Sequence, residues 1–309
     1  MSGPVSERDV EPVSERDSAD PPEVELTDSR EAMVGEMRVR RALPRRTRRT
    51  VGAWCFADHM GPADVTEERG IDIGPHPHIG LQTVTWLFAG EILHRDTLGS
   101  EQVIRPGQLN LMTAGHGVAH SEEATGRYAG PLHGIQLWVA QPAETRDGAP
   151  AFEHHAELPV VELDAATATV LVGQLGSAAS PARRDTDHFG IDLVLRSGRT
   201  TVPVDPAHEH ALVVAEGSVR VDGVVVEPGH LAYLGQGRDE LAIEATDPAR
   251  TLLLGGTPFP EPILMWWNYV ARERSEITAA HDAWLADEER FGTVASPLAR
   301  IEVGPPPWR

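Results

Sequence analysis

Short apolar and β-branched runs, separated by turn residues, recur along most of the chain. Residues 81–88 form one such run, which ends at a Gly, and residues 132–139 alternate roughly between apolar and polar positions. Both patterns are typical of β-strands. Because no helical spacing interrupts residues 51–140, this half of the chain is predicted to form a sandwich or barrel of short strands.

A second β unit follows a connector at residues 141–188. An Asp-Gly pair at 222–223 lies between two apolar strands and is a strong hairpin signal. The Pro-Gly turn at 228–229 repeats the one at 106–107. We therefore interpret the two units as divergent copies of one fold.

The spacing of apolar residues changes near the C-terminus. Ile277, Ala280 and Trp284 recur at helical spacing after Ser275, a residue type that caps helices. The spacing predicts a helix over about 274–289 that packs back on a barrel.

Composition removes several classes of function. The 309 residues carry a formal net charge of −20, which disfavours direct binding to nucleic acid or to an anionic membrane. Every basic residue is Arg, so mechanisms built on lysine are excluded. One cysteine, Cys55, allows no intrachain disulfide and is interpreted as a core residue. Without a signal-peptide pattern or a membrane-length apolar run, we expect a cytoplasmic protein.

The charges are unevenly distributed. Residues 1–31 hold ten Asp or Glu against three Arg and few large apolar residues, so a disordered acidic tail is predicted. Seven of the twelve residues at 38–49 are Arg. That stretch is either an anion-binding patch or, as we favour, a strand and turn that neutralise the acidic surface.

Two pairs of residues carry the candidate chemistry. His76 and His78 precede the strand at 81–88, and alternate residues of a strand face the same side. His120 and Glu122 repeat that spacing with a carboxylate. Brought together across a barrel, three histidines and one carboxylate form a metal site with open positions. The ligand set suits Fe(II), with Cu, Mn or Ni as alternatives.

The sequence around these pairs resembles the pirin family of bicupins. The motifs that carry the resemblance are residues 56–62, 76–78, 112–117 and 120–122. The resemblance implies an all-β fold of two stacked cupin barrels with a short C-terminal helix, and one iron in the N-terminal barrel. The ligands it implies are His76, His78, His120 and Glu122.

The resemblance also suggests how the chain is divided. The expected parts are a disordered tail over 1–31, a metal-binding cupin barrel over 32–145, a cupin barrel without metal over 146–260, and a C-terminal segment with a helix over 261–309. The second barrel does contain His208 and His210, but no carboxylate occupies the later position of the motif.

Two residues depart from the family pattern, and other histidines have more than one interpretation. Gln82 stands where a Glu is common in the family, and His116 where an Arg is common, and neither position belongs to the four implied ligands. His94 either orients a ligand or is an ordinary barrel histidine, and His59 and His133 are interpreted as structural.

The leading hypothesis is an iron-dependent dioxygenase that opens flavonol-type phenols with O2, similar to a quercetin 2,3-dioxygenase. Glu122, the carboxylate of the ligand set, would also be the catalytic base for the substrate hydroxyl. The alternative is a non-catalytic, redox-responsive regulator that binds a transcriptional or metabolic protein partner. A third hypothesis is a structural β protein with a vestigial site. We expect a monomer.

Overall fold

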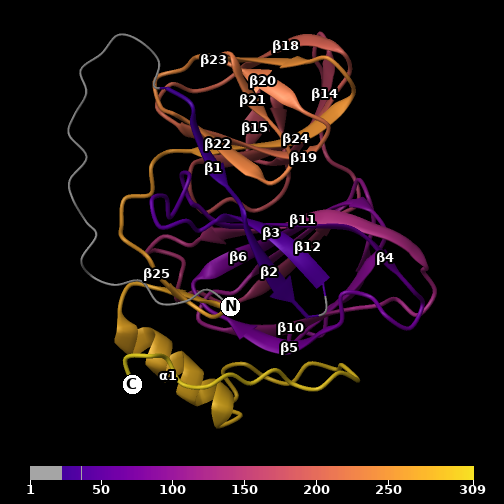
Figure 1. Ribbon diagram of the computed structural model, residues 1–309. Coiled ribbons are helices and arrows are strands. Elements are labelled where there is room, and N and C mark those ends of the chain that lie inside the picture. Colours follow the sequence, from indigo (N-terminus) through magenta and orange to yellow (C-terminus); the bar gives the residue numbers. More distant parts are fainter. Residues whose placement is uncertain (1–22, 36) are drawn as a thin grey trace.

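The computed structural model describes residues 23–35 and 37–309 and consists of two β-barrels, one above the other, with a helix beneath the first (Figure 1). This confirms the predicted all-β bicupin fold. Among the described residues, no helix has the length and apolar character needed to cross a membrane.

The first barrel is built from a seven-stranded and a four-stranded sheet. The larger sheet has the spatial order β12 (Ala151–His155), β9 (Leu109–Thr113), β6 (Leu81–Ala89), β11 (Gly130–Ala140), β4 (Trp54–Val65), β3 (Met37–Leu43) and β2 (Arg30–Val34). The smaller sheet has the order β5 (Ile73–His78), β10 (Val118–Glu123), β7 (Ile92–Asp96) and β8 (Glu101–Ile104). Because β12 pairs with β9, the first barrel extends past the boundary expected at residue 145.

The second barrel repeats this plan. Its larger sheet has the order β1 (Glu25–Asp28), β22 (His230–Gly235), β19 (Glu209–Glu216), β24 (Ala249–Gly256), β17 (His188–Leu195), β14 (Ala166–Val172) and β13 (Val160–Glu162). Its smaller sheet has the order β18 (Gly198–Pro203), β23 (Glu240–Ala245), β20 (Val219–Val221) and β21 (Val224–Val226). A short hairpin of β15 (Gln174–Leu175) and β16 (Ala178–Ala179) lies outside both sheets.

The two barrels share one apolar core, in which residues of both larger sheets pack together. Two tryptophans of the first barrel also donate hydrogen bonds across the junction. The indole of Trp54 donates to the Phe189 carbonyl at 2.9 Å, and that of Trp86 donates to the Asp192 carboxylate at 3.0 Å. Since the buried indole N–H groups are satisfied by the other barrel, the junction is specific as well as apolar.

The expectation of a disordered tail through residue 31 is wrong for its last part. Strand β1 pairs with β22 of the second barrel, and β2 pairs with β3 of the first. The edges of the two sheets offer backbone hydrogen bonds that an acidic segment can use, whatever its side chains. Residues 1–22, the rest of the predicted tail, lie outside the described residues.

The C-terminal segment packs against the first barrel. A hairpin of β25 (Leu264–Trp266) and β26 (Tyr269–Ala271) leads to helix α1 (Arg274–Leu285). The helix ends earlier than the predicted residue 289, because Asp287 adopts a left-handed φ of 56°. Glu273 occupies the N-cap without a side-chain cap, so the role expected for Ser275 is not observed.

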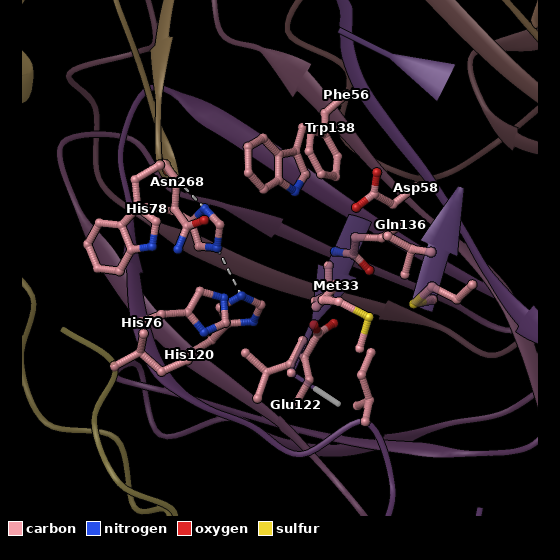
Figure 2. A pocket seen from close by; sticks show the side chains of 18 of the residues that line it. Met33, Phe56, Asp58, His76, His78, His120, Glu122, Gln136, Trp138 and Asn268 are labelled. Carbon is pink, nitrogen blue, oxygen red and sulfur yellow. Dashed lines mark hydrogen bonds between the residues drawn. The ribbon is translucent and has the colours of Figure 1, made fainter. Parts of the chain in front are cut away.

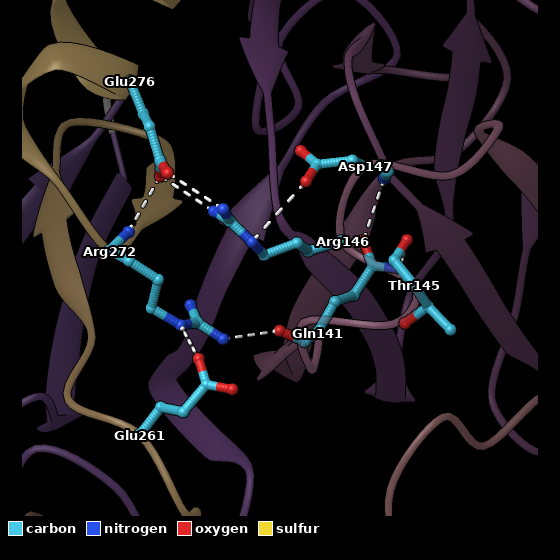
Figure 3. A network of polar contacts seen from close by, with 8 residues as sticks. Gln141, Thr145, Arg146, Asp147, Glu261, Arg272 and Glu276 are labelled. Carbon is cyan, nitrogen blue, oxygen red and sulfur yellow. Dashed lines mark hydrogen bonds and ion pairs between the residues drawn. The ribbon is translucent and has the colours of Figure 1, made fainter.

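Ion pairs join this segment to the barrel (Figure 3). The guanidinium of Arg146 donates to both carboxylate oxygens of Glu276 on α1, at 2.8 and 2.9 Å. Arg272 pairs with Glu261 and also donates to the Gln141 carbonyl. Bidentate pairs of this kind fix direction as well as distance, so the helix is held in one orientation.

Candidate metal centre

Strand pairing brings three histidines together inside the first barrel (Figure 2). In the antiparallel pair of β5 and β10, His120 lies opposite His76, and Val118 lies opposite His78. The ligand nitrogens of His76, His78 and His120 all lie within 4.8 Å of one another, and all three side chains are buried. The same-face spacing within each strand and the register between the strands together create the cluster.

Backbone carbonyls set the protonation of two of these imidazoles. Because a carbonyl only accepts, His76 donates its Nδ1–H to the Gly74 carbonyl at 2.9 Å, and His78 donates its Nδ1–H to the Asn268 carbonyl at 3.1 Å. A neutral imidazole carries one proton. Nε2 of both residues is therefore left as a lone pair, which is the form that binds a metal.

A chain of two hydrogen bonds determines which nitrogen of the third imidazole, His120, carries the proton. The Asp96 carboxylate lies 3.1 Å from Nε2 of His94, and Nδ1 of His94 lies 3.3 Å from Nδ1 of His120. Since the carboxylate accepts, His94 donates from Nε2, and its Nδ1 accepts the Nδ1–H of His120. Nε2 of His120 is thereby also freed. Burial raises the pKa of Asp96, but the hydrogen bonds from His94 and Ser100 outweigh that effect and lower it.

These nitrogens fit a metal cation. Nε2 of His78 and Nε2 of His120 lie 3.0 Å apart with no proton available between them. Burial lowers the pKa of His76 to about 4 and lowers those of His78 and His120 well below the usual value, so all three are neutral at pH 7. Two lone pairs facing each other in an apolar interior repel, and a cation between them removes that repulsion.

Glu122 borders the same cavity but is not a member of the three-residue cluster. A β-bulge separates its register from that of His120. Its carboxyl makes no hydrogen bond with any described residue, and burial raises the pKa of that carboxyl to about 7. The structure thus brings the predicted carboxylate to the wall beside the histidines.

The cavity has a volume of about 160 Å³ and a mostly apolar lining. The cavity is also lined by the buried ion pair of Arg41 with Asp58. Figure 2 shows Asp58 and the Gln136 amide across the cavity from the histidines. Trp138, which stacks on Phe56, lies beside His78, with ring centres 5.3 Å apart. These polar wall residues, together with Asp96 and the Asn268 carbonyl, were missed by sequence reasoning. The Asn268 carbonyl lies 190 residues from His78 and carries no local signal for such a role. Asp96 follows His94 by two residues, a spacing that could have indicated that their side chains share a strand face.

Other residues singled out in the sequence lie away from this cavity. Gln82 donates to Thr113 at 3.0 Å, and His116 is exposed and contacts the Gly148 carbonyl. His59 and His133 contact each other at 2.7 Å near the junction of the barrels. Complete burial raises the pKa of Cys55 to about 12, so its thiol stays protonated and unreactive at neutral pH.

The histidines of the second barrel do not converge. His208 pairs with Asp187 at 3.1 Å, and His210 contacts the Gly235 carbonyl at 3.1 Å. Within residues 23–35 and 37–309, the only cluster that brings three potential ligands together is the one in the first barrel.

Two stacked barrels with a histidine cluster in the first define a bicupin protein with one candidate metal centre. Comparison with known proteins identifies its family. The family models described as Pirin and as Pirin C-terminal cupin domain match residues 36–139 and 191–292. The chain belongs to the pirin family.

Individual relatives agree with this assignment. A Pseudomonas aeruginosa protein named "putative quercetin 2,3-dioxygenase" is 47% identical over 279 residues, which cover 89% of this chain and 88% of that protein. A pirin-like protein of Caulobacter vibrioides is 37% identical and matches over 84% of this chain and 92% of its own length. The crystal structure of a quercetin 2,3-dioxygenase from Acinetobacter baumannii superposes with a TM-score of 0.90 at 41% identity, covering 93% of this chain and 96% of that one.

Proposed function

We propose that this pirin is a metal-dependent dioxygenase that uses O2 to open phenolic substrates of the flavonol type. The observation that carries the proposal is the buried cluster of His76, His78 and His120, whose Nε2 lone pairs converge beside an apolar cavity. The names of the Pseudomonas and Acinetobacter relatives support the same reaction class. Fe(II) is the metal proposed, because the reaction needs a redox-active ion that accepts nitrogen and oxygen ligands.

The residues proposed to hold the metal are the three histidines and Glu122. When bound, the ion would supply a Lewis-acidic and redox-active centre next to which a phenol loses its proton more readily. The hydrogen bonds from His76 to Gly74 and from His78 to Asn268 keep the ligand nitrogens aimed at the cavity. Preorganised ligands of this kind need no rearrangement before the metal binds.

Glu122 is proposed to move the proton. It is a carboxylate at the wall of a cavity with a mostly apolar lining, with no hydrogen bond to any described residue. An unsolvated carboxylate is a stronger base than one in water, because burial destabilises its charge. Its Oε atom would accept the hydroxyl proton of the substrate, while the apolar lining excludes water from the site.

Oxygen consumption tests the proposal. The protein is purified anaerobically and loaded with Fe(II), and O2 uptake is followed with quercetin and a panel of simpler phenols. Wild type should consume O2, and Glu122→Gln should lose at least 100-fold in rate. Glu123→Gln is the matched control, because Glu123 pairs with Arg95 and does not line the cavity.

Metal content is measured on the same samples. Wild type that binds one iron but consumes no O2 with any phenol would refute the dioxygenase. The remaining hypothesis would then be the redox-responsive regulator with a protein partner. If Glu122→Gln loses the iron, Glu122 acts as a ligand, and its role as the base is not supported.

A further inference from the structure

Tryptophan is concentrated in the segment that closes the metal cavity. Four of the seven tryptophans lie between residues 266 and 308, after the second barrel. Trp267 lines the cavity, and the carbonyl of the next residue, Asn268, accepts the Nδ1–H of His78 at 3.1 Å. The segment therefore places an indole next to a candidate metal ligand.

Three of these tryptophans, Trp267, Trp266 and Trp308, lead from the cavity to the surface, and we call them the indole series. The ring centres of Trp267 and Trp266 lie 6.2 Å apart, and those of Trp266 and Trp308 lie 6.3 Å apart. Aromatic pairs in proteins have ring centres about 4.5–7 Å apart, so both pairs are in contact. Trp266 and Trp267 are buried, whereas Trp308 is partly exposed. The series thus begins at the cavity wall and ends at solvent.

Indoles in contact pass an electron between them readily. Tryptophan is among the side chains that lose one electron most easily, and electron transfer slows steeply as the distance between donor and acceptor grows. Non-haem iron sites carry out one-electron and O2 chemistry. An oxidising equivalent that such a site does not spend on a substrate attacks the nearest oxidisable side chains, and here Trp267 is one of them.

The surroundings of the series favour oxidation of the indoles over that of the neighbouring phenol. The ring of Tyr269 is centred 5.4 Å from Trp267 and 6.2 Å from Trp266. Its hydroxyl is buried without a hydrogen-bond partner among the described residues, and burial raises its pKa above the usual value. Since a phenol releases its proton when it loses an electron, Tyr269 stays reduced. His281, centred 5.2 Å from Trp266, is neutral because burial lowers its pKa, so it places no positive charge beside an oxidised indole.

Trp138 also lies beside the histidines but does not continue towards the surface. Its ring centre is 5.3 Å from that of His78, and it stacks on Phe56 at 4.0 Å. The Arg41 guanidinium lies over Phe56, 4.5 Å from the ring centre. A phenyl ring is much harder to oxidise than an indole, and a positive charge beside it opposes the loss of an electron. Oxidation that reaches Trp138 therefore does not move on through Phe56.

We propose that the indole series is an electron-transfer route that carries oxidising equivalents from the metal site to the surface, where a soluble one-electron reductant such as ascorbate removes them. The inference rests on the redox-active metal of the proposed function and adds a second activity, the reduction of peroxide in the absence of a phenol. Trp267 gives one electron towards the metal site, Trp266 reduces the oxidised Trp267, and Trp308 reduces the oxidised Trp266. Reduction of one hydrogen peroxide to two waters takes two electrons and two protons. Two ascorbate monoanions supply them, one electron and one proton each, and the electrons enter at Trp308.

A peroxide challenge followed by peptide mass spectrometry tests the route. The Fe(II)-loaded protein, freed of unbound iron, is treated with hydrogen peroxide without a phenol, and the zinc-loaded protein is the redox-inactive reference. Oxidation of Trp308 in the iron protein should exceed that in the zinc protein, and ascorbate should suppress it. Equal oxidation of Trp308 in the two proteins would overturn the proposal, because peroxide would then attack Trp308 directly from solvent.

Trp266→Phe interrupts the route and keeps an aromatic ring. Oxidation of Trp308 should fall to the level of the zinc-loaded protein, and oxidation of Trp267 should rise. Trp284→Phe is the matched control, because Trp284 is buried in the same segment but its ring contacts Phe291, at 5.8 Å between centres, and this variant should behave as wild type does.

Unchanged oxidation of Trp308 in a Trp266→Phe protein of normal iron content would overturn the route. If Trp266→Phe does not fold, Trp308→Phe decides, because Trp308 is partly exposed and its replacement removes the outer end of the series. Oxidation should then remain on Trp266 and Trp267, and a level on both residues no higher than in wild type would contradict the proposal.

The outcome is separable from that of the proposed function. Iron-dependent oxidation of Trp308 that Trp266→Phe removes, without O2 uptake on any phenol, would reject the dioxygenase and retain the route. O2 uptake with quercetin, together with an unchanged oxidation pattern in Trp266→Phe, would retain the dioxygenase and reject the route.

Discussion

Asp96→Asn should weaken metal binding although Asp96 lies outside the ligand cluster. One carboxylate oxygen of Asp96 accepts the amides of Leu98 and Ser100, both at 2.9 Å, and the other accepts Nε2–H of His94 at 3.1 Å. Asn keeps the first oxygen and replaces the second by an NH2 group. The turn over residues 96–100 therefore keeps its hydrogen bonds, and only the hydrogen bond to His94 changes.

The altered hydrogen bond to His94 should also change the tautomer of His120, the candidate metal ligand. An NH2 group donates, so His94 must accept at Nε2 and carry its proton on Nδ1, which faces Nδ1 of His120 at 3.3 Å. His120 can no longer donate from that atom, and its proton moves to Nε2, the atom needed for the metal. Loss of such a supporting partner costs 10- to 100-fold in metal affinity, or about 1.4–2.7 kcal/mol.

Competition with a chromophoric chelator measures this loss, with Zn(II) as the metal at pH 7.5. The matched control is Asp185→Asn, because Asp185 pairs with Arg183 and Gln141 far from the cluster. The control should bind zinc as tightly as wild type. Wild-type affinity in a folded Asp96→Asn protein would refute the relay from Asp96 through His94 to His120.

Three further predictions concern stability. Burial lowers the pKa of His76 from 6.5 to about 4, so the unfolded chain binds this proton more tightly than the folded protein does. Between pH 6.5 and pH 4, His76 alone should lower the free energy of unfolding of the metal-free protein by about 3 kcal/mol in thermal melts, and His78 and His120, whose pKa values burial also lowers, should add to that loss. Hydrogen bonding from Arg146 lowers the pKa of Glu276 to about 2. Glu276→Gln should therefore lower the free energy of unfolding in urea at pH 7 by about 1 kcal/mol, and this difference from wild type should disappear as the pH falls from 4.5 towards 2. Asp192→Ala should lower the free energy of unfolding in the same assay by about 3–5 kcal/mol, because it leaves the Arg250 charge and the Trp86 indole unpaired at the barrel junction. A loss below about 1 kcal/mol would contradict this prediction.

The sequence was sufficient to predict the cluster because strand geometry is local. The spacing of His76 and His78, and of His120 and Glu122, determines which side chains share a face, and a residue-by-residue reading gives this directly. The register that puts His120 opposite His76 is a long-range property. The spacing does not determine this register, and the resemblance implied the set of ligands without implying how the two strands pair.

The N-terminal strands could not be predicted for a different reason. The residues of β1 are mostly exposed, and its composition is that of a solvated segment. What orders it is the backbone pairing with β22, from Glu25 opposite Tyr233 to Asp28 opposite His230. A free sheet edge more than 200 residues away leaves no trace in the composition of the segment that pairs with it.

The C-terminal segment shows why the histidine motif alone does not specify the site. His78 owes its protonation to the Asn268 carbonyl, and Trp267 and Ile301 line the cavity, although all three residues lie outside the barrel that holds the cluster. Gly74 permits this packing, because a Cβ there would lie 2.0 Å from the Ala299 carbonyl oxygen. The strand pair places the ligands, but the segment after the second barrel sets the tautomer of one of them and closes the cavity. Residues far from the motif therefore take part in shaping both the candidate metal site and the cavity beside it.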